Sequence, residues 1–272
     1  MPSRTGSYER LHSLEAMIHG LKRVIVAFSG GSDSAFLLWV CARVLPAADL
    51  AAVTFCSATT PVREIRWAIS VARSLSVRHV FLPGPEMQSE SFLVNDLSRC
   101  YQCKRERFCF LQQKTGILPG AQVIEGSVVD DLEDSRPGMQ AIREAGVRSP
   151  LLETGMSKLD IARIAQHANL AFSPRPSESC LATRIDTGLA IDIPLLQKLA
   201  QAEEALHDMG FEQVRVRWNG EEARIEFIQS DLPRAFLERN MIDAVLSRYG
   251  FELISPVYSE YGTKGKRGGD HE

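Results

Sequence analysis

A short run of small and polar residues, "SGGSDS", is the first part of the sequence that could do chemistry. Its two glycines let the backbone turn sharply and approach an anion, and its serines offer hydroxyl donors. Its aspartate could hold a magnesium ion that screens phosphate charge. A tight capped turn is the alternative, and two glycines alone would favour it. The residues expected to bind a nucleotide in this loop are Ser29, Gly30, Gly31, Asp33 and Ser34.

Three cysteines form a second set that could do chemistry. Cys100 and Cys103 stand in "RCYQCKRERF" as a CxxC pair at the start of an expected helix, a spacing that lets two thiolates bind one metal ion or cluster. Cys180 lies alone in "SESCLATR". Spare thiols are one alternative; a structural zinc ion is another, although no fourth Cys or His stands at short spacing.

The composition excludes several classes of protein. The 272 residues carry 31 basic and 34 acidic side chains, a net charge of -3, so nothing global draws the chain to nucleic acid or to an anionic membrane. We expect no signal peptide and no membrane span, and therefore a cytoplasmic protein. Six cysteines are too few for a disulfide framework at this length. Cys41 and Cys56 lie in apolar segments and are expected in the core, and Cys109 is given no role.

The elements that must position these residues follow a regular alternation. Apolar, β-branched runs at 23–28, 50–56, 78–83 and 121–127 predict buried strands, and helical patterns lie between them. Such alternation predicts an α/β fold with a doubly wound parallel sheet. Ligands of such sheets bind where the strands end and the helices begin, and "SGGSDS" occupies such a position.

The pattern changes after the proline- and serine-rich loop that contains Cys180. A long helix, two alternating strands around "NGEE", a further helix and a short strand predict a small α+β unit. We therefore expect a first domain at 1–186, a C-terminal α+β domain at 187–258 that serves substrate binding or oligomerisation, and a disordered tail at 259–272.

The loop resembles the signature of a known superfamily. "AFSGGSDS" is similar to the motif of the PP-loop ATP pyrophosphatases, which cut ATP between its α and β phosphates and transfer AMP to a substrate. This resemblance accounts for the absence of the lysine found in common phosphate loops, because the loop would hold departing pyrophosphate. It does not distinguish NAD synthetases, GMP synthetases, argininosuccinate synthetases and tRNA-thiolating enzymes.

Longer matches resemble the LarE family of ATP-dependent sulfur transferases. They are "EDSRPGMQAIREAGVRSPLLE", "SCLATR" and "AEEALHDMGFEQVRVRWNGEEARIE". The resemblance implies that the chain adenylates the carboxylates of a pyridinium dicarboxylate mononucleotide and converts them to thiocarboxylates, for a nickel-pincer nucleotide cofactor. Some members sacrifice one cysteine; the set Cys100, Cys103 and Cys180 is similar to members that hold a 4Fe-4S cluster and use its extra sulfide.

Other site residues are implied by the same resemblance. The expected cofactor is ATP with magnesium, and the expected partner is a sulfide donor. The chain is expected to form a homo-oligomer, which is a hexamer in the family, and to bind neither nucleic acid nor membrane. An acidic position of the family falls on Arg234 or is displaced to Asp231, which leaves a second metal site open. The implied contacts are Gly126 and Arg136 with nucleotide, Arg184, Arg215 and Arg217 with substrate, and Glu203 with a metal ion.

Three other functions fit parts of the pattern. A tRNA thiolase would also pair a PP-loop with three cysteines, but the near-neutral charge and the lack of a basic domain oppose it. An NAD synthetase-like ligase would leave the cysteines without a role. A non-enzymatic ATP sensor would not explain the arginine-rich strand "VRVRW".

Overall fold

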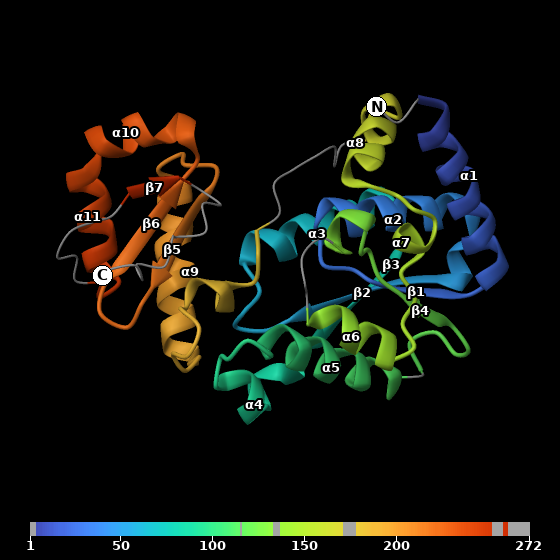
Figure 1. Cartoon of the computed structure of the whole chain (residues 1–272), viewed down its shortest axis with the longest axis horizontal. Coiled ribbons are helices and arrows are strands. Elements are labelled where there is room, and N and C mark those ends of the chain that lie inside the picture. The colour runs from blue at the N-terminus through green and yellow to red at the C-terminus, as the bar shows by residue number, and fades with distance from the viewer. Residues whose placement is uncertain (1–3, 115, 133–136, 171–177, 252–257, 261–272) are drawn as a thin grey trace, which may run out of the picture. The chain divides into compact units, whose positions relative to one another are not determined.

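The structure is a computed structural model of the chain, and it describes residues 4–114, 116–132, 137–170, 178–251 and 258–260. It divides into two compact units, Met1–Ser179 and Cys180–Glu272. Each unit has its own sheet and its own helices (Figure 1). Among the described residues, no helix combines the length and the apolar character that a membrane crossing requires.

The first unit is built on a parallel sheet. Its strand order is β3-β2-β1-β4, and every neighbouring pair is parallel. The chain therefore builds the sheet outward from β1 to β3 and then returns to the other side of β1 with β4. The strands are β1 (Val24–Ala27), β2 (Leu50–Cys56), β3 (Arg78–Pro83) and β4 (Gln122–Ile124).

Helices cover both faces of this sheet (Figure 1). Alternate side chains of the strands enter opposite layers, because successive residues of a strand point to opposite faces. Val24 and Val26 pack with α1, α2 and α8, whereas Ile25 packs with Leu111 of α5. The helices are α1 (Arg4–Leu21), α2 (Ser32–Val44), α3 (Val62–Ser74), α4 (Glu90–Leu93), α5 (Arg99–Gln112), α6 (Gly138–Glu144), α7 (Pro150–Glu153) and α8 (Lys158–His167), with 3-10 turns η1 (Ala47–Asp49), η2 (Pro85–Gln88) and η3 (Val129–Leu132).

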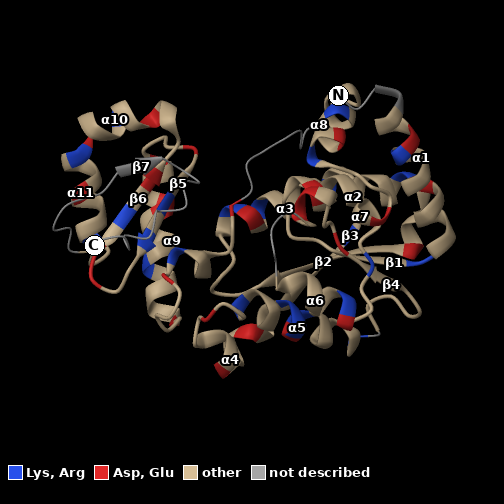
Figure 2. Cartoon of the chain, viewed as in Figure 1, with Lys and Arg blue, Asp and Glu red and all other residues tan. Residues whose placement is uncertain are grey.

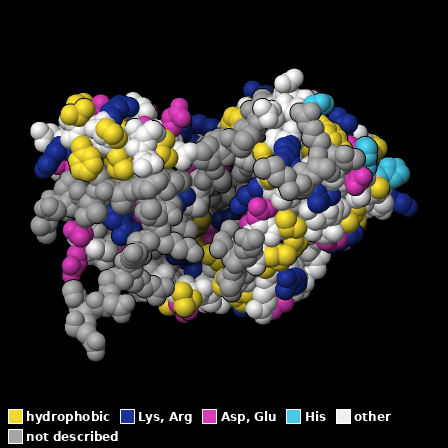
Figure 3. All heavy atoms as spheres, turned by 45° about the horizontal axis from the view of Figure 1, so that its top comes forward, with side chains coloured by type: hydrophobic (Ala, Val, Ile, Leu, Met, Phe, Trp, Pro, Cys, Tyr) yellow, Lys and Arg dark blue, Asp and Glu magenta, His cyan; other side chains and the backbone are white. Residues whose placement is uncertain are grey.

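The second unit carries a three-stranded sheet. The pair β5–β6 is antiparallel and β6–β7 is parallel. Its strands are β5 (Val214–Trp218), β6 (Ala223–Phe227) and β7 (Tyr258–Glu260), and its helices are α9 (Ile193–Asp208), α10 (Leu232–Leu237) and α11 (Arg239–Arg248), with η4 (Leu181–Arg184) and η5 (Gln229–Asp231). On α10 and α11, Phe236, Leu237 and Met241 are exposed, and hydrophobic side chains gather on this unit in Figure 3.

The predicted α/β class with a parallel sheet is confirmed. The fourth strand is shorter than the predicted 121–127, because the residues after Ile124 leave the ladder to form buried polar contacts. The predicted boundary at 186/187 stays a prediction, while the packing of the chain divides between Ser179 and Cys180. Of the predicted tail, residues 259 and 260 belong to β7, and 261–272 lie outside the described residues.

Candidate functional site

The loop "SGGSDS" lies between the end of β1 and the start of α2. Gly30 has φ of 88°, a conformation that favours glycine, and Gly31 precedes the first residue of the helix. The Ser34 hydroxyl donates to the Gly31 carbonyl at 2.9 Å, so its other contact, with Ser29 at 3.0 Å, must receive the Ser29 hydrogen. The two serines thus fix the loop around the N-terminus of α2, where Asp33 also lies.

Gly126 brings the end of β4 against this loop. A Cβ atom at Gly126 would lie 3.0 Å from both the Cα and the backbone nitrogen of Ser34, so a side chain there would displace the start of α2. The strand order reverses between β1 and β4, and open parallel sheets bind ligands at such a switch point, beyond the carboxyl ends of the strands. Gly126 therefore lies beside the loop that carries the other predicted nucleotide contacts, and its own predicted role stays a prediction. Arg136 lies outside the described residues. The predicted contacts in the loop are Ser29, Gly30, Gly31, Asp33 and Ser34.

A buried hydrogen-bond chain supports the loop from behind. The Thr54 hydroxyl donates to the Phe28 carbonyl at 2.7 Å. The Thr54 hydroxyl has only one hydrogen, and it donates this hydrogen to Phe28. Its 2.8 Å contact with Nε2 of His79 therefore requires that nitrogen to carry the proton. The chain runs from β3 through β2 to the residue just before Ser29, and sequence patterns gave no sign of it.

Removing the Thr54 hydroxyl should destabilise the protein. Thr54→Val leaves a buried carbonyl and a ring N–H without their partner, a loss of about 1–3 kcal/mol in the free energy of unfolding. Thr54→Ser keeps the hydroxyl and should lose less than half as much. Urea denaturation at neutral pH measures both values, and equal losses would show that the hydroxyl is not the cause.

His79 should make stability depend on pH. Burial lowers the pKa of His79 from its ordinary 6.5, so the unfolded chain takes up the proton first as the pH falls. Stability from the neutral ring is therefore complete above pH 6.5 and is lost as the pH falls through the folded pKa. His79→Gln keeps an N–H donor without titrating, so urea denaturation between pH 7.5 and 5 should show a flatter profile for this variant.

Cys100 and Cys103 lie on one face of the first turns of α5. Cys100 is exposed and Cys103 is half-buried, and the two stand at the i, i+3 spacing that lets two thiols share a ligand. The predicted role of this pair as ligands of a metal ion or cluster stays a prediction. Cys109 is exposed six residues further along the helix, away from that face, and Cys180 begins the second unit.

The other two cysteines differ in their surroundings. Cys41 is buried, as the sequence predicts, and burial raises the pKa of its thiol. Cys56 is half-buried at the end of β2, where burial raises its pKa against the opposing effect of Arg107. Across the described ranges, no group of three or more His, Cys, Asp or Glu side chains is gathered closely enough to hold a metal ion, so the three-cysteine set stays a prediction.

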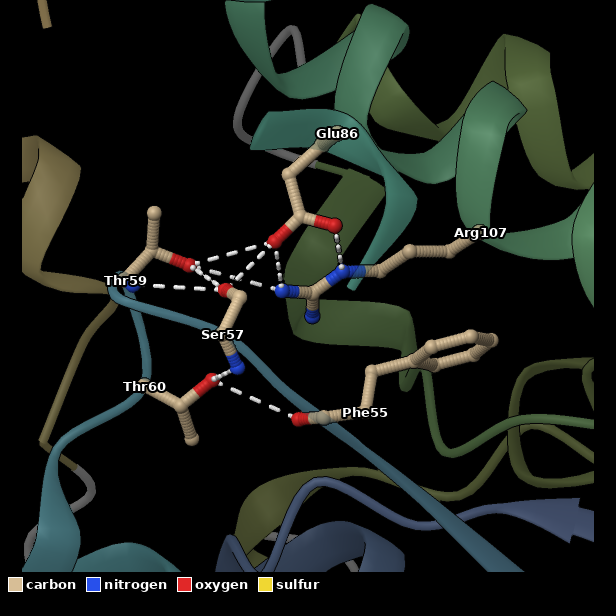
Figure 4. A network of polar contacts seen from close by, with 6 residues as sticks. All are labelled: Phe55, Ser57, Thr59, Thr60, Glu86 and Arg107. Atoms are coloured by element: carbon tan, nitrogen blue, oxygen red, sulfur yellow. Dashed lines mark hydrogen bonds and ion pairs between the residues drawn. The ribbon is translucent and has the colours of Figure 1, made fainter. Parts of the chain in front are cut away.

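A buried ion pair fixes α5 at the carboxyl edge of the sheet (Figure 4). Glu86, which is fully buried, accepts from Nε of Arg107 at 3.0 Å and from its terminal NH2 at 2.5 Å. Ser57, just beyond β2, donates to the same carboxylate at 2.7 Å. Burial alone would raise the pKa of Glu86, but the hydrogen bonds and charge of Arg107, with Ser57, hold it below its ordinary value. Arg107 lies one turn beyond Cys103, so this pair positions the helix that carries the CxxC motif.

The second unit pairs the predicted Arg184 with the predicted Glu203. Arg184 is 1% exposed and donates to the Glu203 carboxylate through Nε at 2.8 Å and a terminal nitrogen at 2.9 Å. Glu203, 4% exposed, also accepts from the Val216 amide at 2.8 Å. The two residues thus join η4, α9 and β5, and their predicted roles with substrate and metal stay predictions.

Arg215 and Arg217 share one half-buried face of β5, as the sequence predicts. Arg217 donates to the buried Glu226 of β6 at 2.5 Å and to the Thr183 carbonyl at 2.7 Å. Arg224 approaches the same oxygen of Glu226 at 3.5 Å. On this face Arg215 lies opposite Glu226 and Arg217 lies opposite Arg224, so it carries more positive than negative charge. Charged side chains of both signs lie on β5 and β6 (Figure 2).

The parallel sheet with helices on both faces makes the first unit a Rossmann-like α/β domain. No family model matches the chain. It is 36% identical over 217 residues, 80% of this chain and 81% of the relative, to an uncharacterized protein of Synechocystis sp.. The chain belongs to the same family as that protein.

Two further relatives extend the comparison over more of the chain. The pyridinium-3,5-bisthiocarboxylic acid mononucleotide synthase of Lactiplantibacillus plantarum is 28% identical over 243 residues, 89% of this chain and 88% of the synthase. An uncharacterized protein of Methanocaldococcus jannaschii is 29% identical over 243 residues, 88% of this chain and 92% of that protein. The similarity to the synthase supports the resemblance to the LarE family.

Proposed function

We propose that the protein is an ATP-dependent sulfurtransferase that converts the carboxylates of a pyridinium dicarboxylate mononucleotide to thiocarboxylates, in the synthesis of a nickel-pincer nucleotide. The observation that carries the proposal is the similarity, over 89% of the chain, to a synthase named for that product. The loop at the switch point of the sheet supports the use of a nucleotide.

The nucleotide step belongs to the first unit. Backbone amides around Gly30 and Gly31 and the N-terminus of α2 would bind the phosphates of ATP, and Asp33 would hold magnesium. Gly126 keeps the end of β4 close to the loop without a side chain in the way. A carboxylate reacts poorly because oxide is a poor leaving group; transfer of AMP to it supplies a better one and releases pyrophosphate.

The sulfur step would use the cysteines. Cys100 and Cys103 present two thiols on one helical face, and Cys180 would complete the set. A 4Fe-4S cluster held by these three thiolates would supply a sulfide at the iron that the protein leaves unligated. The Glu86–Arg107 pair holds α5 in place for this purpose.

The second unit would bind the substrate's charged groups. Arginine matches phosphate and carboxylate bidentately, and the face of β5 and β6 carries Arg215 and Arg217 with an excess of positive charge. The buried Arg184–Glu203 pair holds η4, which follows Cys180, against β5. A homo-oligomer that covers the exposed apolar side chains of α10 and α11 is part of this proposal.

Anaerobic incubation with ATP, magnesium, sulfide and the pyridinium dicarboxylate mononucleotide tests the proposal. The product should show sulfur-for-oxygen exchange by mass spectrometry, with one pyrophosphate released for each carboxylate activated. Cys180→Ala should abolish the exchange and leave most of the pyrophosphate release. Pyrophosphate release without sulfur incorporation in the wild type would contradict the proposal, and thiolation of co-purified RNA would favour a tRNA thiolase.

A further inference from the structure

Glu64 is a buried carboxylate that the proposed reaction does not use. It lies in the first turn of α3 and is 4% exposed. A Cβ atom at Gly30 would lie 3.3 Å from Oε2 of Glu64 and 3.1 Å from its backbone oxygen. Glu64 therefore packs directly against the backbone of the loop "SGGSDS", at its glycine with positive φ.

The other oxygen of the same carboxylate holds a different segment. Oε1 of Glu64 accepts from the backbone amide of Glu178 at 3.2 Å. The side chain of Glu178 in turn lies 3.9 Å from Nε of Arg63, the residue before Glu64. The start of α3 thus anchors Glu178, which precedes Cys180 by two residues in the sequence. One carboxylate contacts both the loop and the segment that leads to Cys180.

The negative charge of Glu64 makes its contact with the loop sensitive to bound nucleotide. A polyphosphate in the loop brings negative charge close to a carboxylate that burial shields from water, and like charges repel more strongly there than in solvent. The loop and the carboxylate must adjust to each other when nucleotide binds. Because Oε1 is bound to Glu178, that adjustment reaches the amide of Glu178.

We infer that Glu64 is a positioning residue that couples nucleotide occupancy of the loop to the segment leading into Cys180. Nucleotide binding weakens the hydrogen bond between Oε1 of Glu64 and the backbone amide of Glu178. Glu178 and Ser179, which precede Cys180, are then released at the stage when the carboxylate of the substrate is activated. The inference rests on the proposed function, because it requires the loop to bind ATP.

Hydrogen–deuterium exchange at the Glu178 amide, resolved by fragmentation mass spectrometry, tests the coupling. The full-length protein is compared with and without magnesium and α,β-methylene ATP, which resists cleavage between its α and β phosphates. In the wild type, saturating analogue should speed exchange of this amide about five- to tenfold, the low end of typical couplings between sites. No change at saturation would overturn the inference.

Two variants separate charge from structure. Glu64→Gln keeps an acceptor of the same size but no charge, so Glu178 should stay protected without nucleotide and the analogue should no longer speed its exchange. Glu64→Ala should exchange fast in both conditions, and Glu9→Ala, at an exposed position of α1, should behave like the wild type. An undiminished nucleotide effect in Glu64→Gln would overturn the coupling.

Calorimetric titration of the same samples distinguishes the two possible failures. A wild type that does not bind the analogue contradicts the nucleotide site, and the proposed function fails with it. A wild type that binds the analogue but leaves Glu178 unchanged contradicts only the role of Glu64. Thermal unfolding of each variant shows whether the whole protein is destabilised. A local change at Glu178 leaves the exchange of the strand amides unchanged, whereas global destabilisation speeds their exchange as well.

Discussion

Glu203→Leu should lower the free energy of unfolding of the second unit by about 3–5 kcal/mol, the usual cost of breaking a buried ion pair from one side. The substitution leaves the guanidinium of Arg184, 1% exposed, without its carboxylate. It also removes the acceptor of the Val216 amide. Both losses fall on contacts that join η4, α9 and β5.

The double variant Arg184→Met, Glu203→Leu is the matched control. Replacing both charges removes the unpaired cation, and buried pairs are often neutral against apolar residues of similar volume, so most of the stability should return. Glu238→Gln, at the half-buried pair with Arg234, should cost less than about 1 kcal/mol, because both partners still reach solvent. If the double variant is as unstable as Glu203→Leu alone, the unpaired charge is not the cause.

Fluorescence of Trp218 during chemical denaturation measures these values in the second unit. Trp218 lies at the end of β5, and the chain's other tryptophans, Trp39 and Trp67, belong to the first unit. Replacing those two by phenylalanine in every sample keeps the signal local. Sulfur transfer by the double variant is measured in parallel. A loss of sulfur transfer in the stable double variant would indicate that Arg184 or Glu203 also binds substrate or metal.

Arg107→Leu should destabilise the first unit by about 3–5 kcal/mol at neutral pH and should invert its acid dependence. In the wild type the pKa of Glu86 lies below its ordinary 4.5, so its stabilisation is present above pH 4.5 and is lost as the pH falls through the folded pKa. Without Arg107, the effect of burial prevails and the pKa of Glu86 rises above 4.5. The loss of stability caused by the buried, unpaired carboxylate of Glu86 then grows as the pH rises from 4.5.

Denaturation curves at several pH values between 4 and 7.5 check this inversion. Arg105→Leu is the matched control, because Arg105 lies on the same helix and is 44% exposed, so its loss should stay within about 0.5 kcal/mol. A pH profile of Arg107→Leu parallel to that of the wild type would contradict the role given to Glu86. Binding of iron by Cys100 and Cys103 in this variant would report how far the pair positions α5.

The strands of the first unit could be predicted because buried parallel strands have a simple signature. "LAAVTFC" and "RHVFLP" match β2 and β3 at both ends. Of these two, burial is as predicted only for β2; the prediction that 78–83 is buried is wrong, because β3 lies at the edge of the sheet and none of its residues is buried. Ser157 forms a capping box with Asp160 at the start of α8, and a serine three residues before an acidic residue is the sequence signature of such a cap. These features depend on neighbouring residues, which a single sequence displays.

The contacts around the candidate site depend on residues far apart in the chain. Glu86 and Arg107 meet across 21 positions, and Glu64 and Glu178 across 114, with no periodic pattern to link them. A lone glutamate in "PGPEMQ" has the composition of an exposed turn, although Glu86 is fully buried. Resemblance to a family pointed to Arg184 and Glu203 one at a time, and only the fold shows that they bind each other.

Under the proposed function, the contact between Gly126 and Ser34 makes nucleotide binding a late event in folding. These residues are separated by two other strands in the chain but meet at adjacent strands of the sheet, so closing this contact orders a long loop and carries its entropic cost. A nascent chain that has not yet docked β4 lacks the part of the proposed site that Gly126 forms. ATP in the cell would therefore select fully assembled sheets over partly folded ones and raise their apparent stability by mass action.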